Sequence, residues 1–153
     1  MRFQVLLLLA FLTVAALGAP EKEPGEKVFE EGQKKAKALS KKLERKKLSL
    51  EKGDELPEKL QKDADEVVRL FTEAADAGYA EAQRAIGGMF NVGYMVEKDD
   101  EQAIKYFTMA AEQGNLDSLS NLATMYKDGV GVERDIGKAV ILYEKAAAGG
   151  HAT

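Results

Sequence analysis

Apolar residues in the second half of the chain recur at spacings of three and four, which places them on one face of an α-helix. Within residues 79–114, Ala82, Ile86 and Phe90 mark a first amphipathic helix, and Ala103 and Phe107 mark a second. Residues 115–150 repeat this order of two helices. The pattern predicts an all-α fold made of helix–turn–helix units.

The two units are copies of one pattern displaced by 36 positions, as Ala74, Ala110 and Ala146 illustrate. A fixed period of this length indicates a stacked helical repeat. We expect small side chains to let neighbouring helices approach and aromatic ones to fill the layer between them. The residues expected in the repeat core are Ala82, Ile86, Phe90, Ala103, Phe107, Leu122, Tyr126, Ala139 and Tyr143.

Helix ends are predicted from capping residues at the same period. Aspartates are expected to cap the N-termini of the second helices, at Asp63, Asp99 and Asp135. Glycines tolerate the left-handed conformation that often ends a helix. They are expected to end the first helices at Gly93 and Gly129, and the second helices at Gly78, Gly114 and Gly150.

The stretch GVGVERDIGKA, residues 129–139, is close to a phosphate-binding loop but lacks its spacing and its final hydroxyl residue. One period earlier the same positions read GYMVEKDDEQA, without the Gly-Lys pair. A phosphate-binding loop also follows a strand, whereas a helix is expected before Gly129. We therefore interpret these glycines as a turn between two helices.

This pattern of alanine, aromatic, glycine and aspartate columns resembles the Sel-1-like repeat, a relative of the tetratricopeptide repeat. The resemblance covers a half unit, residues 63–78, and two units, residues 79–114 and 115–150. Ser118, Ala123 and Met95 depart from the columns. The resemblance implies an α/α superhelix, or solenoid, of Sel-1-like helix–turn–helix repeats.

By similarity to tetratricopeptide proteins, the non-core positions of the first helices are expected to line a concave surface that binds a peptide or protein segment. The competing interpretation is that they are ordinary solvated positions. These positions are Glu81, Arg84, Gly88, Asn91, Asp117, Ser120, Thr124 and Lys127.

The N-terminus has the features of a secretory signal peptide, predicted over residues 1–19: an initial positive charge, an apolar run and small residues at its end. The alternative, an uncleaved anchor, would need a longer apolar run, so no membrane span is expected in the mature chain. Residues 20–62 are expected to hold a charged leader and a divergent or capping helix, with Ala36, Leu39, Leu43 and Leu50 on one face. A disordered leader is the alternative for this segment.

Composition argues against several classes of function. The net charge is −4, which does not favour nucleic acid as a partner. The chain has no cysteine and one histidine, His151, so we expect no disulfide, metal, cofactor or catalytic site. Ser49–Lys52 matches the S-x-x-K element of penicillin-recognising enzymes, but the companion motifs are absent.

These observations predict a non-enzymatic scaffold or adaptor of the secretory pathway that binds proteins or peptides, with endoplasmic-reticulum quality control as one role implied by the resemblance. The alternatives are a secreted or periplasmic repeat protein with another partner and, more remotely, a penicillin-binding or penicillin-hydrolysing repeat enzyme. Because two and a half repeats form a thin stack, we also expect self-association through the C-terminal repeat face.

Overall fold

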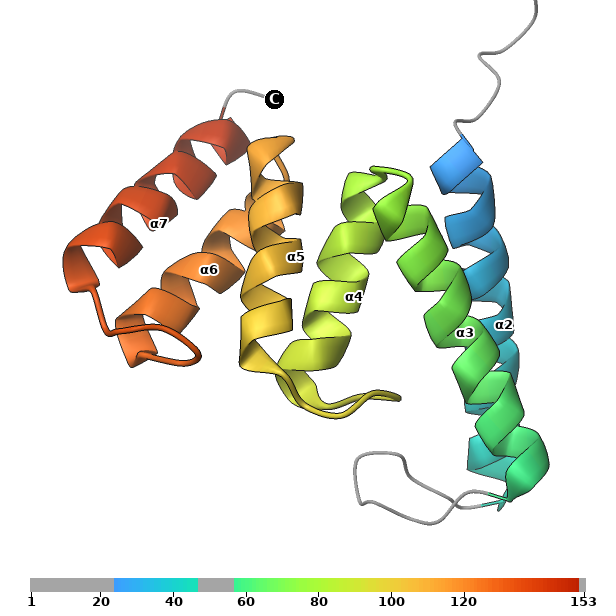
Figure 1. The fold of residues 1–153 in the computed structure, drawn as a ribbon. Coiled ribbons are helices and arrows are strands. Elements are labelled where there is room, and N and C mark those ends of the chain that lie inside the picture. Colours follow the sequence, from blue (N-terminus) through green and yellow to red (C-terminus); the bar gives the residue numbers. More distant parts are fainter. Residues whose placement is uncertain (1–23, 47–56, 152–153) are drawn as a thin grey trace, which may run out of the picture.

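A computed structural model describes residues 24–46 and 57–151, which form six α-helices and no strand (Figure 1). The helices are α2 (Pro24–Lys46), α3 (Glu58–Asp76), α4 (Ala80–Val92), α5 (Asp100–Glu112), α6 (Leu116–Asp128) and α7 (Ile136–His151). None of the described helices has the length and apolar character needed to cross a membrane. The predicted signal peptide and the Ser49–Lys52 motif lie outside the described residues.

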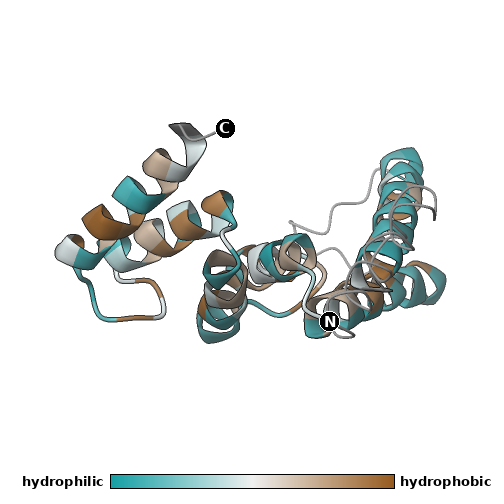
Figure 2. Ribbon diagram, turned by 90° about the horizontal axis from the view of Figure 1, so that it is seen from above, coloured by the Kyte–Doolittle hydropathy of each residue, from teal (hydrophilic) through white to brown (hydrophobic). Residues whose placement is uncertain are grey.

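The helices form three hairpins, α2–α3, α4–α5 and α6–α7, arranged one after another (Figure 1). Contacts are densest within each hairpin, and α3–α4 and α5–α6 packing joins one hairpin to the next. Seen from above, the helices of the α2–α3 end are mostly hydrophilic, and apolar bands are more frequent along α6 and α7 (Figure 2).

The turns follow the capping pattern expected from the sequence. Gly93 and Gly129 end α4 and α6 in the left-handed conformation, with φ of 71° and 72°. Only glycine adopts this conformation without a steric cost. Asp99 accepts a hydrogen bond from the Gln102 amide at 2.9 Å, and Asp135 accepts one from the Lys138 amide at 2.8 Å. The N-caps predicted for α5 and α7 are confirmed.

Two capping predictions are wrong. Asp63 lies inside α3 rather than at its start, because the helix already begins at Glu58, directly after Pro57. The fixed φ of a proline suits a helix start, and the Asp63 carboxylate accepts a hydrogen bond from Lys42 of α2 at 2.6 Å. Gly150 does not end the last helix, because α7 continues through it to His151.

The predicted core positions differ in burial along the stack. Ala82, Ile86, Ala103, Phe107, Leu122 and Ala139 are buried. Phe90 and Tyr126 are half-buried. The expectation for Tyr143 is wrong, since the residue is 38 % exposed. Its counterpart Phe107 is covered by α6, whereas no described helix follows α7 to cover Tyr143.

Helix α2 packs against α3, and against Tyr79 just before α4, through aromatic and aliphatic contacts. The Phe29 ring lies 5.1 Å from the ring of Phe71 and 5.3 Å from that of Tyr79, centroid to centroid. Further along, Leu39 and Leu43 form a buried cluster with α3 side chains. Residues 24–46 are thus a packed helix, and Leu39 and Leu43 lie on its buried face as predicted.

Met95 takes the place that Gly131 has in the next unit, and it has a left-handed φ of 63°. This conformation is unfavourable for a residue with a side chain. The Met95 side chain packs against both the cluster around Phe29 and the cluster around Leu39. We attribute the tolerance of methionine here to that packing, which offsets part of the backbone cost.

Candidate functional site

The eight residues predicted to line a binding surface belong to α4 and α6, and we call this surface the α4–α6 face. Its members range from half-buried to exposed. The Asp117 side chain is 79 % exposed, and those of Glu81 and Arg84 are partly covered. Most polar groups of the face are therefore within reach of another molecule.

Polar side chains from two repeat units meet at the N-terminal ends of α4 and α6. The Glu81 carboxylate accepts hydrogen bonds from Arg84 Nε at 3.0 Å and from the side-chain amide nitrogen of Asn115 at 2.6 Å. Arg84 Nε also lies 3.9 Å from the Asp117 carboxylate. The fold thus brings three of the predicted residues together, with Asn115 as an addition from the turn before α6.

The other predicted residues are not part of this cluster. Ser120 donates a hydrogen bond to the Leu116 carbonyl, and Thr124 shares one with the Tyr143 hydroxyl at 2.8 Å. Lys127 forms an ion pair with its neighbour Asp128. Gly88 has open space where a side chain would stand. Asn91 is half-buried near the end of α4.

Gln83 makes buried polar contacts that the sequence pattern did not predict. Its side chain is 2 % exposed, donates to the Ala75 carbonyl at 3.0 Å and accepts from the Gln113 amide at 2.7 Å. One period later the position is Leu119, so the repeat gives no signal for a buried polar residue here. The bridge links α3, α4 and the end of α5.

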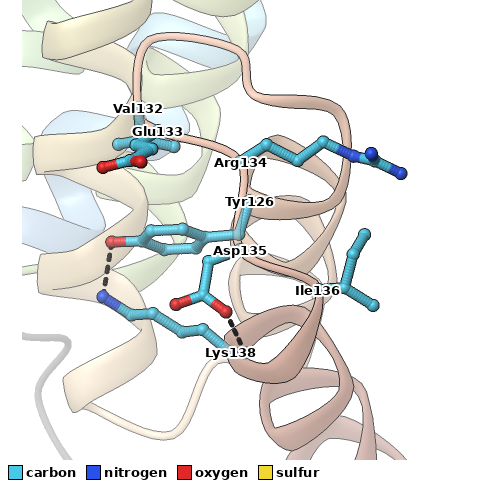
Figure 3. A pocket seen from close by; sticks show the side chains of 7 residues that line it. All are labelled: Tyr126, Val132, Glu133, Arg134, Asp135, Ile136 and Lys138. Atoms are coloured by element: carbon cyan, nitrogen blue, oxygen red, sulfur yellow. Dashed lines mark hydrogen bonds between the residues drawn. The ribbon is translucent and has the colours of Figure 1, made fainter.

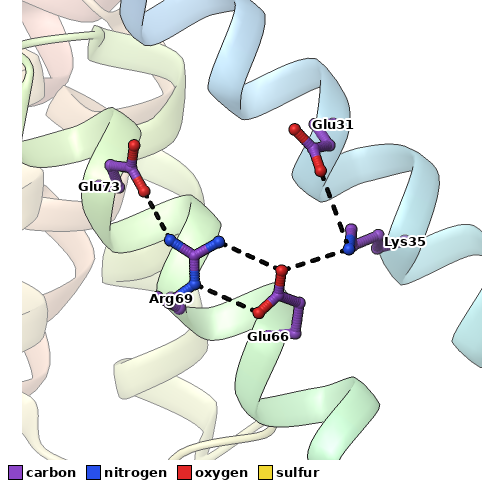
Figure 4. A network of polar contacts seen from close by, with 5 residues as sticks. All are labelled: Glu31, Lys35, Glu66, Arg69 and Glu73. Atoms are coloured by element: carbon purple, nitrogen blue, oxygen red, sulfur yellow. Dashed lines mark hydrogen bonds and ion pairs between the residues drawn. The ribbon is translucent and has the colours of Figure 1, made fainter.

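A second polar network joins α2 to α3 (Figure 4). The Glu66 carboxylate accepts from Arg69 of its own helix and, at 3.2 Å, from Lys35 of α2. Arg69 also binds Glu73, and Lys35 also pairs with Glu31. The hydrogen bond from Arg69, followed by that from Lys35, lowers the pKa of Glu66 from 4.5 to about 2.

Because the folded-state pKa of Glu66 lies below its ordinary value, the unfolded chain binds a proton more readily than the folded one. Its stabilising contribution is therefore present above pH 4.5 and is lost as the pH falls towards 2. We expect Glu66→Gln to lower the urea midpoint at neutral pH, and this difference from the wild type to shrink steadily as the pH falls from 4.5 through 2.

Glu58→Gln is the control, since the Glu58–Lys62 pair lies within α3 and does not reach α2. Urea titrations of the three proteins across this pH range test the assignment. A Glu66→Gln effect that persists unchanged near pH 2 would show that the network does not act through the ionised carboxylate.

The turn between α6 and α7 borders a cleft of about 610 Å³ (Figure 3). The Lys138 ammonium donates to the Tyr126 hydroxyl at 2.6 Å and lies 4.0 Å from the centre of its ring. Gly129 and Gly131 both have positive φ, and the segment before Gly129 is helix α6. Residues 129–135 thus form a turn, as interpreted, whereas residues 136–139 already belong to α7, and helix α6 rather than a strand precedes the turn.

Within residues 24–46 and 57–151, no three histidine, cysteine, aspartate or glutamate side chains are grouped so that they could hold a metal ion. The arrangements found there are hydrogen-bonded and ion-paired surfaces between helices. Charged and hydrogen-bonding side chains are what these surfaces present.

Comparison with known proteins agrees with this architecture. The family model described as Sel1 repeat matches residues 48–79, 80–115 and 116–151. Its first match begins before the half unit expected at residues 63–78. Sel1 repeat proteins are generally protein-interaction scaffolds and typically not enzymes. No curated protein matches the chain.

Three solved structures illustrate the likeness. A Sel1 repeat protein from Oxalobacter formigenes is 25 % identical over 90 % of this chain, with a TM-score of 0.63. A protective antigen of uropathogenic Escherichia coli with an SLR fold is 35 % identical over 56 % of the chain, with a TM-score of 0.54. Cysteine-rich protein B of Helicobacter pylori, at 24 % identity over 56 % of the chain and a TM-score of 0.54, shares the fold.

The chain spans 49 %, 18 % and 65 % of these three proteins, respectively. Together with the family match, the structures establish an all-α solenoid of helical repeats as the fold.

Proposed function

The chain belongs to the Sel1 repeat family, and on this basis we propose that it is a scaffold that binds protein or peptide segments through the α4–α6 face. The observation that carries the proposal is the cluster of Glu81, Arg84 and Asp117 across two repeat units. A partner that contacts both units at once must extend along the stack.

The chemistry of the cluster indicates how a polypeptide would bind. Glu81 is occupied by Arg84 and Asn115, so it holds the guanidinium in place. The Asp117 carboxylate is the most exposed of the three groups and is available to accept hydrogen bonds from backbone amides or a basic side chain. Charged hydrogen bonds of this kind give orientation and specificity.

Charge-reversing variants test the face. We expect Arg84→Glu and Asp117→Lys each to reduce capture of cross-linked protein partners about tenfold, which corresponds to about 1.4 kcal/mol. The measurement is quantitative mass spectrometry after cross-linking in the cells that express the chain. Lys41→Glu is the matched control for Arg84→Glu, because it makes the same change of charge at a residue that is exposed on α2 and has no ion-pair partner among the described residues.

Equal recovery of every partner by the wild type and both α4–α6 variants would contradict binding at this face. Loss of the same partners with Lys41→Glu would show that the effect is one of overall charge rather than of position.

We also propose that this scaffold works in the secretory pathway, with a role as a lumenal adaptor in endoplasmic-reticulum quality control. The support is the signal-peptide pattern of residues 1–19. N-terminal sequencing should find a mature chain that starts after Gly18 or Ala19. Recovery with ubiquitin-ligase components supports the adaptor role, and complete export to the medium would favour the alternative of a secreted binder.

A further inference from the structure

A second surface, which we call the α7 groove, is lined by residues of α5, α6 and α7 and has a volume of about 360 Å³. Its floor is apolar and includes Leu119, Leu122 and Leu142. Lys138 and Lys145 of α7 form one rim, and Glu112 of α5 belongs to the opposite side. The groove is distinct from the α4–α6 face, since none of the eight residues of that face lines it.

The preceding repeat unit shows why the groove is open. The counterpart of Leu142, one period earlier, is Tyr106, which is buried and stacks on Phe90 with their rings 6.0 Å apart. Tyr106 packs in one cluster with Ala75 and Ile86, the counterparts of the groove residues Ala111 and Leu122. In the last unit a leucine replaces this tyrosine and leaves the space unfilled.

A second difference makes the floor of the groove apolar. In the preceding unit Gln83 stands at the position of Leu119, and its amide is engaged by the Ala75 carbonyl and by Gln113. Leu119 has no such groups to satisfy. The same fold position is thus a closed, hydrogen-bonded seam in one unit and an open leucine-lined surface in the next.

The two lysines of the rim are also specific to the last unit, whereas Glu112 has an acidic counterpart in Asp76. Lys138 and Lys145 stand where the preceding unit has Gln102 and Met109. Lys138 is held over the Tyr126 ring (Figure 3). Within the part of the chain that the structure describes, neither Lys145 nor Glu112 has an ion-pair partner. The groove therefore combines an uncovered apolar floor with unneutralised positive charge on the α7 side.

We propose that the α7 groove binds an acidic amphipathic helix of another protein, with apolar side chains on the leucines and carboxylates facing Lys138 and Lys145. The two lysines are seven residues apart on α7, which is about two helical turns or roughly 10 Å. Glutamates seven residues apart on a partner helix lying along α7 have the same spacing. Glu112 on the other rim favours a basic or neutral flank on that side of the partner.

The test uses a fluorescein-labelled helical peptide of about 18 residues, with a leucine stripe at i, i+3, i+4 and i+7 and glutamates seven residues apart along one flank. Its binding to the full chain is measured by fluorescence anisotropy. We expect saturable binding that weakens with added salt. A peptide with lysines in place of those glutamates is expected to bind at least tenfold more weakly.

Two variants of the chain localise the binding. Leu142→Tyr introduces the side chain that Tyr106 has at the corresponding position of the preceding unit, where it fills the space of the groove. We expect this variant to weaken peptide binding at least tenfold without lowering the urea midpoint. Lys145→Glu is expected to weaken binding of the acidic peptide and to improve binding of the lysine peptide. Lys41→Glu, with the same change of charge on α2, is expected to bind like the wild type.

Absence of peptide binding, or equal affinity for the wild type, Leu142→Tyr and Lys145→Glu, would overturn the proposal. The proposal would also be overturned if the wild type is a dimer without peptide and Leu142→Tyr is a monomer. In that case a second copy of the chain occupies the groove of the wild type. Arg84→Glu separates the two surfaces: it should leave peptide affinity unchanged even where it abolishes capture through the α4–α6 face.

Discussion

Replacing Phe107 by alanine is expected to lower the free energy of unfolding by about 3–5 kcal/mol, the usual cost of removing a buried aromatic ring. Phe107 is 1 % exposed and shares a cluster with Leu122 and Met125 of α6. On its other side the ring lies so close to Gly87 of α4 that a Cβ there would meet it at 3.0 Å. One side chain thus joins two repeat units, and its loss leaves a cavity between them. Urea unfolding followed by circular dichroism measures the effect.

The matched control is Tyr143→Ala, which changes the same position one period later. Tyr143 is 38 % exposed and lacks a following helix among the described residues. We expect it to cost less than about 1 kcal/mol, as is usual for residues outside the core. If Tyr143→Ala costs as much as Phe107→Ala, the outer side of α7 is covered in solution, and self-association through this face becomes the explanation.

Gly32→Ala is expected to destabilise the docking of α2 by up to about 2 kcal/mol, although alanine favours helix by about 1 kcal/mol. A Cβ at position 32 would stand 2.5 Å from the Phe71 ring, which is itself packed against Phe29. Overpacking of this kind costs about 1–3 kcal/mol and exceeds the gain in helix propensity. Thermal unfolding and the exposure of α2 to limited proteolysis report the effect.

Gly88→Ala makes the same chemical change in the middle of α4, where nothing lies within 4 Å of the added atom. Here only the helix propensity acts, and we expect a gain of about 0.5–1 kcal/mol. Opposite signs for the two substitutions would show that the close approach of α2 to Phe71 exists in solution. Stabilisation by Gly32→Ala would instead mean that the two helices are further apart.

The period of 36 residues was sufficient to predict the helical hairpins and the residues that fill them, because core positions repeat when every unit packs on its neighbours. It failed where one unit departs from the rest. Asp63 has the register of a cap, but Pro57 starts α3 earlier. Tyr143 has the register of a core residue, but its burial depends on a helix that would follow.

Features that differ from one unit to the next were harder to predict for a related reason. Gln83 and Leu119 share a position, so neither a buried amide nor an open groove follows from the common pattern. Both result from differences between units: Gln113 supplies the partner for Gln83, and Leu142 takes up less space than Tyr106. The period therefore predicts the helical scaffold, whereas the Gln83 contact and the groove depend on residues that differ between the units.

The uneven packing along the stack has a consequence for folding kinetics. Contacts are dense within the α2–α3, α4–α5 and α6–α7 hairpins and sparser between them. Such local contacts favour rapid folding, which can start in any hairpin. The α6–α7 hairpin joins the rest mainly through α5, so its amide protons should exchange with solvent before those of α4–α5. A ligand seated between α5 and α7 would slow that exchange by holding the last hairpin closed.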